Sequence, residues 1–182
     1  MTIIYFVRHA HSVYTNDEYN RPLSEKGLHD AQKITQQFKQ IEIDAVYSSP
    51  YKRAIQTVEG IASFKGLSVQ IIDALKERTL GNIGNTNFLQ AIEKVWGNHE
   101  YSFEGGESNK AAQQRAIEVF LPLLENDKEQ RIVIGTHGNI LTLILNYFDK
   151  SIGIEFWKEL NMPAIIQCEI QNQKVIDIKL LS

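Results

Sequence analysis

Two segments of the chain are continuously apolar and rich in β-prone side chains. Residues 3–7 form the first and residues 132–134 the second. Such runs are typical of strands covered on both faces in a parallel sheet, because a half-exposed strand alternates polar and apolar positions. The first run leads into Arg8 and His9, and the second leads into Gly135-Thr136-His137-Gly138. The pattern therefore predicts two buried strands that each end close to a histidine.

Apolar residues spaced three and four positions apart predict several helices. Ser24 can cap a helix whose apolar stripe runs from Leu28 to Ile41, and Ser49-Pro50 can open another helix that carries Arg53. Further helices are expected at residues 88–96, 108–124 and 140–148. Shorter β-prone runs predict strands at residues 45–47 and 67–72, and a closing hairpin at residues 164–170 and 175–181.

Strands that alternate with helices predict an α/β fold with a largely parallel sheet. We expect a three-layer αβα sandwich whose central sheet is mostly parallel and has an antiparallel edge strand. No linker or repeat interrupts the pattern, so one domain over residues 1–182 is expected. Ligands of such sheets bind beyond the carboxyl ends of the strands, where Arg8, His9 and His137 are placed.

Composition and charge restrict the function further. The 182 residues include 19 basic and 22 acidic side chains, a formal net charge of −3, and neither sign forms a long block. This distribution argues against nucleic acid and membrane surfaces as partners. Cys168 is the only cysteine, so an intramolecular disulfide is excluded. The apolar run before Arg8 is too short for a signal peptide, and the uncharged stretch 132–148 is broken by glycines; we expect a cytoplasmic protein.

Six short motifs occur in order from residue 3 to about residue 145. The motifs are Val7-Arg8-His9-Ala10, Leu23-Ser24-Glu25-Lys26-Gly27, Ser48-Ser49-Pro50 with Arg53-Ala54 and Thr57, Leu75 with Glu77, Gly105-Gly106-Glu107-Ser108, and Gly135-Thr136-His137-Gly138-Asn139. Together they resemble the histidine phosphatase superfamily, also called phosphoglycerate-mutase-like. The resemblance covers most of the chain and implies a phosphoglycerate-mutase-like fold and phosphoryl transfer through a phosphohistidine.

The residues of these motifs fit the chemistry of a phosphate monoester. The ester is a dianion, and guanidinium groups bind phosphate oxygens in pairs, so Arg8 and Arg53 are candidate phosphate ligands. Neutral imidazole is a competent nucleophile near pH 7 when an acceptor holds its other ring nitrogen. His9 fits this role, and the resemblance implies a phosphohistidine there.

The second histidine motif and an acidic residue complete the expected catalytic set. His137 would donate to the transferring phosphoryl group, and backbone N–H groups around Gly138 and Asn139 could assist at a helix start. Glu77 occupies the general-acid position of the family, from which it would protonate the leaving alcohol and then activate water. The alternative for Glu77 is a surface ion pair with its basic neighbours. Because arginines replace a divalent cation, we expect neither a metal nor a cofactor.

Five residues are candidates for the edge of the substrate site: His11, Asn16, Arg21, Glu107 and Asn139. Arg21 could line the entrance, and His11 either reaches the edge or faces solvent. Asn16 resembles an asparagine that some family members use near the phosphate, although it stands one residue later. Glu107 is either a helix N-terminal carboxylate, with Arg115 as a structural partner, or a contact of the nucleophile or the acid.

Residues 80–106 are expected to form a short segment that covers the substrate. Only 27 residues, Arg78 to Glu104, separate Glu77 from Gly105. A short cover excludes water poorly, which favours a phosphatase acting on a small phosphorylated metabolite. The alternatives are a phosphoglycerate mutase, a protein phosphohistidine phosphatase and a non-catalytic phospholigand-binding module. Aromatic side chains of this segment could form an apolar lid or close the core: Phe88, Trp96, Tyr101 and Phe103.

Overall fold

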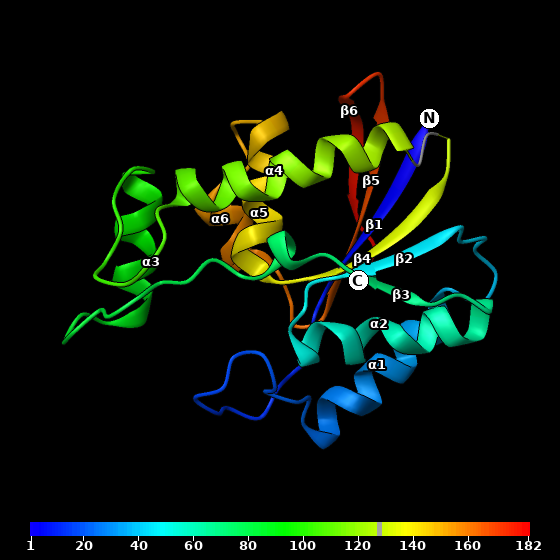
Figure 1. Ribbon diagram of the computed structural model, residues 1–182, viewed down its shortest axis with the longest axis horizontal. Helices are drawn as coiled ribbons and strands as arrows, with labels where there is room; N and C mark the ends of the chain where they lie inside the picture. The colour runs from blue at the N-terminus through cyan, green and yellow to red at the C-terminus, as the bar shows by residue number, and fades with distance from the viewer. Residues whose placement is uncertain (127–128) are drawn as a thin grey trace.

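A six-stranded sheet with the strand order β3-β2-β4-β1-β5-β6 forms the centre of the protein (Figure 1). The computed structural model describes residues 1–126 and 129–182. Strands β1, β2, β3 and β4 are parallel, β5 pairs antiparallel with β1, and β6 pairs antiparallel with β5. The predicted mostly parallel sheet with an antiparallel edge is confirmed. The strands are β1 (Thr2–Arg8), β2 (Ala45–Ser48), β3 (Val69–Ile71), β4 (Arg131–Thr136), β5 (Ala164–Gln171) and β6 (Lys174–Leu180).

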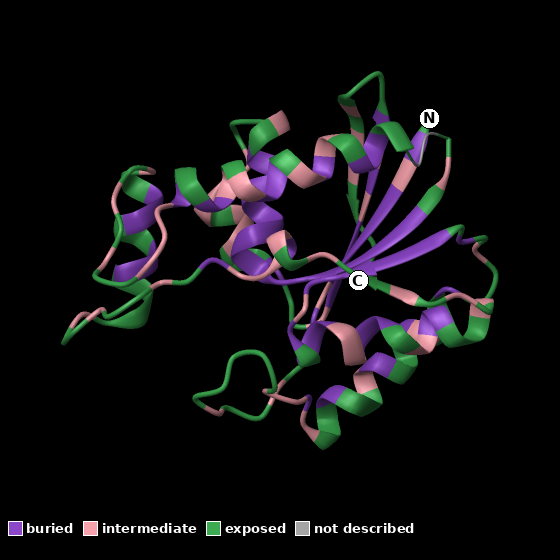
Figure 2. Cartoon of the chain, in the orientation of Figure 1, coloured by how far each residue is buried: buried purple, intermediate pink, exposed green. Residues whose placement is uncertain are grey.

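Helices cover both faces of the sheet. In β1, Ile4 and Phe6 belong to the core cluster shared with α4 and α5, whereas Tyr5 and Val7 belong to the cluster shared with α1 and α2. The strand is therefore buried on both sides, as Figure 2 shows for the whole centre of the sheet, and the three-layer arrangement is confirmed. The helices are α1 (Glu25–Gln37), α2 (Lys52–Lys65), α3 (Phe88–Gly97), α4 (Asn109–Asn126), α5 (Gly138–Phe148) and α6 (Ile154–Glu159), with a 3-10 helix at Asp73–Leu75.

Several element boundaries differ from the predicted ones. Helix α2 begins at Lys52 rather than at Pro50, because the Ser49 hydroxyl accepts the Tyr51 N–H in the turn before it. Strand β3 is shorter than the predicted run, and α5 begins two residues earlier, at Gly138. Leu28 is 43% exposed, because the buried stripe of α1 begins at Gly27 instead.

The carboxyl ends of β1, β2 and β4 lie at one edge of the sheet. The N–H of His9 donates to the Thr136 carbonyl, and the N–H of Ser49 donates to the Gly135 carbonyl, each at 2.9 Å. Residues that directly follow three neighbouring parallel strands are thus brought together. This edge is the predicted position of a ligand site.

No helix in residues 1–126 or 129–182 is both long enough and apolar enough to cross a lipid bilayer.

Candidate active site

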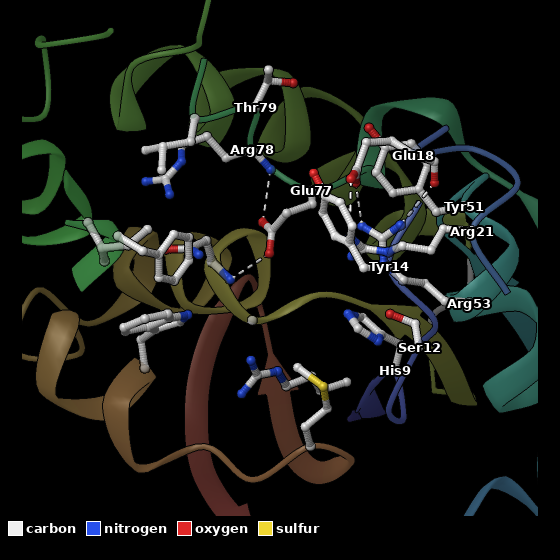
Figure 3. A pocket seen from close by; sticks show the side chains of 18 of the residues that line it. His9, Ser12, Tyr14, Glu18, Arg21, Tyr51, Arg53, Glu77, Arg78 and Thr79 are labelled. Atoms are coloured by element: carbon white, nitrogen blue, oxygen red, sulfur yellow. Dashed lines mark hydrogen bonds and ion pairs between the residues drawn. The ribbon is translucent and has the colours of Figure 1, made fainter. Parts of the chain in front are cut away.

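A cavity of about 740 Å³ opens at the carboxyl edge of the sheet (Figure 3). Eight of the eleven residues expected at a site line it: Arg8, His9, His11, Arg21, Arg53, Glu77, Gly138 and Asn139. Figure 3 shows His9, Glu18, Arg21 and Arg53 on one side of the cavity, with Glu77 closer to its centre. His137, Asn16 and Glu107 are not among the lining residues.

A hydrogen bond from one ring nitrogen to the backbone fixes the His9 imidazole. Its Nδ1 lies 2.7 Å from the Ala10 carbonyl, which can only accept, so the proton of the neutral ring is on Nδ1 and the lone pair is on Nε2. Burial lowers the pKa of His9 to about 3, and the charges of Arg53, Arg8 and Arg21 add to this effect against the opposing Ala10 bond. His9 is therefore a neutral imidazole at pH 7 with an unprotonated Nε2.

His137 lies against His9, fully buried. The two rings meet edge to face with centroids 5.1 Å apart, and His137 Nε2 lies 2.7 Å from the Ser49 hydroxyl. Burial lowers the pKa of His137 well below its usual value. The positive charges of Arg53, Arg21 and Arg8 lower it further. If Ser49 donates to Nε2, the ring proton is on Nδ1, which is buried without a hydrogen-bond partner among the described residues.

Arg8 and Arg53 are each held to the protein by part of the guanidinium. Arg8 Nη1 donates to the Leu160 carbonyl at 2.8 Å, and Arg53 donates from Nη1 to the Glu18 carbonyl and from Nη2 to the Glu18 carboxylate, both at 2.9 Å. In both arginines the Nε atom is buried and has no partner within the described part of the chain. Unpaired buried donors are rare in folded proteins, and an anion that accepts from them would remove the penalty.

The Glu77 carboxylate caps the N-terminus of α5 from a different segment. Its Oε1 accepts the N–H groups of Arg78 and Ile140 at 2.8 Å, and its Oε2 accepts the Asn139 N–H at 3.0 Å. The alternative of a surface ion pair with a basic neighbour is not seen among the described salt bridges. The N–H groups expected to assist phosphate binding at Asn139 therefore bind Glu77 here.

Two residues expected at the edge of the site lie outside the cavity. Asn16 is exposed and accepts from the Tyr14 hydroxyl at 3.5 Å. Glu107 forms a two-point ion pair with Arg115, from Nε at 2.7 Å and from Nη2 at 2.8 Å, and it also accepts the Thr79 N–H. Arg115 is thus the structural partner of Glu107, as expected. His11 reaches the edge of the cavity and its Nδ1 lies 2.8 Å from the Ser24 hydroxyl.

Of the four aromatic side chains in residues 80–106, only Phe88 lines the cavity. Trp96 is buried and its indole N–H donates to the Asn139 side chain at 3.1 Å. Tyr101 and Phe103 meet edge to face and pack on the main core. Three of the four aromatic side chains thus pack on the core, and one lies at the site.

A model of the histidine phosphatase superfamily (branch 1) matches residues 4–175, most of the chain. The chain belongs to the histidine phosphatase superfamily. Phosphoserine phosphatase 1 of Hydrogenobacter thermophilus is 27% identical over 150 residues, which cover 75% of this chain and 71% of that protein. A 2,3-bisphosphoglycerate-dependent phosphoglycerate mutase of Cytophaga hutchinsonii is 26% identical over 167 residues, which cover 82% of this chain and 78% of the mutase.

The fold is shared with solved structures of the superfamily. A mutant phosphoserine phosphatase of Entamoeba histolytica, in complex with phosphoserine, has a TM-score of 0.79 at 19% identity and covers 100% of this chain and 96% of its own. Membership of the superfamily supports a phosphatase or mutase activity for this chain.

The sequence did not predict five residues that lie at the cavity or against His137: Ser49, Tyr51, Glu18, Arg78 and Trp157. Ser49 belongs to one of the six motifs and directly follows a strand, so its position in the sequence could have indicated a role at the site. The Tyr51 ring lies under the Arg53 guanidinium at 4.7 Å. Glu18 and Trp157 come from a loop and from α6, and no sequence pattern links either to the strand ends.

Within the described residues, no group of three or more His, Cys, Asp or Glu side chains is arranged to hold a metal ion.

Proposed function

We propose that the protein is a phosphomonoester hydrolase that acts on a small phosphorylated metabolite through a phosphohistidine at His9. The observation that carries the proposal is the state of the His9 ring. Its Nδ1 proton is committed to a backbone carbonyl and burial keeps the ring neutral, so Nε2 is available as a nucleophile. The guanidinium charges of Arg53, Arg8 and Arg21 surround the same ring, and such positive charges would stabilise a bound phosphate dianion.

Arg8 and Arg53 would hold the phosphate. Arg8 is anchored through Nη1, and Arg53 is anchored through Nη1 and Nη2. Each has a buried Nε–H, unpaired among the described residues, from which a phosphate oxygen could accept a hydrogen bond. His137, through Nδ1, would donate to the transferring group next to His9, where charge spreads over the equatorial oxygens. These contacts favour the transition state because the donors are already in place before the reaction.

The reaction has two displacement steps. In the first, His9 Nε2 forms a bond to phosphorus while the bond to the ester oxygen breaks, and the leaving alkoxide takes a proton from the Glu77 carboxyl group. In the second, water attacks phosphorus, gives its proton to the Glu77 carboxylate, and the phosphorus–nitrogen bond breaks to release orthophosphate. Glu77 lines the same cavity as His9, which supports the proposal that both groups act on one substrate.

Hydrolysis is favoured over phosphoryl transfer between metabolites because the cavity is open to water. Tyr14 and Phe88, at its rim, are 77% and 58% exposed. A mutase must protect its phosphohistidine from water, and an open rim offers little protection.

The test is phosphate release from a panel of phosphorylated sugars, glycerates, nucleotides, phosphoserine and p-nitrophenyl phosphate in the presence of a chelator. We expect chelator-resistant release that is lost in His9→Ala and in Arg53→Ala. His29→Ala, which removes an exposed histidine of α1, is the matched control and should keep full activity. Chelator-sensitive release, or release that survives the loss of His9, would contradict the proposal.

A further inference from the structure

The position of one proton on the His137 ring decides whether this residue can donate to a phosphoryl group. Burial and the nearby positive charges keep the ring neutral, and a neutral imidazole has one N–H and one bare nitrogen. A proton on Nδ1 would let that atom donate to a phosphoryl oxygen, whereas a bare Nδ1 would direct its lone pair at the anion. The group that selects the tautomer therefore controls what His137 can do.

The Ser49 hydroxyl is the one hydrogen-bond partner that the His137 ring has among the described residues. His137 Nε2 lies 2.7 Å from Ser49 Oγ, and Nδ1 has no partner there. Both side chains are fully buried, so neither can turn to solvent for a replacement. The tautomer of His137 thus depends on which of these two groups donates to the other.

The surroundings of Ser49 favour its hydroxyl as the donor. Ser49 Oγ already accepts the Tyr51 N–H at 3.2 Å, and within the described residues His137 Nε2 is the one acceptor in reach of the hydroxyl proton. If the hydroxyl donates, only the His137 Nδ1–H is left unpaired. If Nε2–H donates instead, both the hydroxyl proton and the Nδ1 lone pair are left unpaired. Because unpaired buried polar groups are costly, the first arrangement is the more stable one.

The turn between β2 and α2 holds the Ser49 hydroxyl against the ring. The Ser49 N–H donates to the Gly135 carbonyl at 2.9 Å, which fixes the serine beside the end of β4, where His137 follows. The rings of His9 and Tyr51 each meet the His137 ring edge to face, with centroids 5.1 Å apart. The imidazole is therefore confined, with Nε2 toward the serine and Nδ1 left for a ligand.

The groups proposed to bind phosphate surround the same ring. Besides burial, the charges of Arg53, Arg21 and Arg8 lower the pKa of His137, which means that these guanidinium groups lie close to it. A phosphate held by Arg8 and Arg53 for attack by His9 would lie next to His137. Its oxygen could accept from Nδ1–H and so pair the one donor that the fold leaves unpaired on this ring.

We propose that Ser49 is a positioning residue, which donates to His137 Nε2 and thereby keeps the His137 proton on Nδ1, where it meets the phosphoryl group. The use of Nδ1–H in the reaction rests on the proposed phosphatase function, whereas the tautomer does not. Ser49 itself contacts no reacting atom in this account, and it acts through His137 alone.

Nitrogen NMR of the imidazole reads the tautomer directly. A ring nitrogen that carries a proton and one that carries only a lone pair have widely separated ¹⁵N chemical shifts, and His137→Asn identifies the His137 signals among those of the five histidines. At pH 7 we expect a protonated Nδ1 and a bare Nε2 in the wild type. In Ser49→Ala the two shifts should move toward each other as the proton occupies both nitrogens. Ser49→Thr keeps a hydroxyl and should retain the wild-type shifts.

Ser48→Ala is the matched control for this measurement. Ser48 is the neighbouring serine, is equally buried, and donates its hydroxyl to the Ser49 carbonyl at 2.8 Å rather than to an imidazole. The variant therefore loses one buried hydroxyl of the same kind in the same turn. We expect it to keep the wild-type tautomer of His137.

The kinetic test uses the same variants with p-nitrophenyl phosphate. Removal of a preorganised donor lowers kcat by about 100- to 1,000-fold, and Ser49→Ala keeps the donor ring but not its fixed tautomer, so we expect kcat to fall roughly tenfold. Ser49→Thr and Ser48→Ala should retain most of the wild-type kcat. A larger loss in Ser49→Ala than in Ser48→Ala separates the effect on His137 from the general loss of a buried hydroxyl.

The NMR measurement separates failure of this inference from failure of the phosphatase proposal. A proton on Nδ1 that depends on the Ser49 hydroxyl supports the positioning role even if no ester is hydrolysed, and the wild-type shifts test the tautomer even if a variant does not fold. A proton on Nε2 in the wild type, an unchanged tautomer in Ser49→Ala, or equal losses of kcat in Ser49→Ala and Ser48→Ala would overturn the role of Ser49. Each of these results would leave the reaction through His9 standing.

Discussion

At the scale of single residues, the Glu77 carboxylate combines a structural contact with a proposed catalytic one. It accepts three backbone N–H groups, two of which belong to the first turn of α5. Those N–H groups have no partner within the helix, so the carboxylate stabilises the helix start and is oriented by it. The same contacts hold it in the cavity beside the proposed leaving group.

Glu77→Gln should lower both activity and stability. We expect kcat for alkyl phosphates to fall by about 100-fold or more, the usual contribution of a general acid, and kcat for p-nitrophenyl phosphate to fall much less because its leaving group needs little protonation. The glutamine amide has one accepting oxygen instead of two, because its NH₂ group can only donate. It therefore cannot accept all three N–H groups, and the loss of a helix cap lowers the free energy of unfolding by about 1 kcal/mol. Steady-state kinetics on both esters and a urea unfolding curve measure the two effects. Equal losses of kcat on the two esters would argue against an acid role.

The site residues differ in how far the sequence could predict them. His9 and His137 directly follow buried strands, and parallel strands end at one edge, so the pattern of the chain is enough to place them together. The Glu18 contact with Arg53 and the Trp157 contact with Gly138 depend on how a loop and a short helix fold back. Such contacts join residues far apart in sequence without any periodic pattern, so the sequence did not predict them.

At the scale of elements, Arg115 of α4 holds the segment that carries Glu77. Besides its ion pair with Glu107, its guanidinium donates to the carbonyls of Ala74, Lys76 and Glu77 at 2.6 Å, 3.0 Å and 3.2 Å. Burial tends to raise the pKa of Glu107, but the hydrogen bond and charge of Arg115 outweigh it and lower the pKa. One side chain therefore connects α4 to the backbone at the proposed acid.

Arg115→Gln should loosen this segment. We expect the free energy of unfolding to fall by about 2 kcal/mol, the order expected when hydrogen bonds to a charged group are lost, and kcat to fall while the inhibition constant of inorganic phosphate changes little. Chemical unfolding and inhibition kinetics provide the measurements. Lys110→Gln, which breaks an exposed ion pair on the same helix, should leave both quantities unchanged. An Arg115→Gln variant with wild-type kcat would show that the segment does not need this anchor.

The elements of the fold followed the apolar pattern except where the pattern was short. The strands and long helices were predicted because each buries a continuous run or a regular stripe. Helix α6 was not predicted, because its six residues contain no fully buried side chain and so produce no clear stripe. It nevertheless supplies Trp157, which lines the cavity.

At the scale of the whole molecule, the buried neutral histidines connect stability to pH. The pKa of His9 is about 3 in the folded protein, whereas an exposed histidine has a value near 6.5. Below about pH 6.5 the unfolded chain binds a proton at His9 and the folded chain does not, so protonation favours unfolding. The contribution of neutral His9 to the free energy of unfolding is therefore complete above about pH 6.5, and it is lost as the pH falls towards about 3.

His9→Asn should make the protein less sensitive to acid. Asparagine keeps an N–H donor for the Ala10 carbonyl but does not titrate, so the pH dependence of the unfolding free energy should become shallower by about 1.4 kcal/mol per pH unit between about pH 6.5 and about pH 3. Urea unfolding across this pH range measures the slope. His29→Asn, at an exposed histidine, should keep the wild-type slope; an unchanged slope in His9→Asn would mean that His9 is not held neutral by the fold.

The covalent intermediate tests the central claim most directly. Wild-type protein mixed with p-nitrophenyl phosphate that carries a radioactive phosphoryl group and quenched within milliseconds should retain label that is stable in alkali and released by acid, as phosphohistidine is, in an amount equal to an initial burst of p-nitrophenol. Peptide mapping should place the label on His9, and His9→Ala should carry none. Steady hydrolysis without trapped label or a burst, or label that persists in His9→Ala, would contradict a reaction through His9.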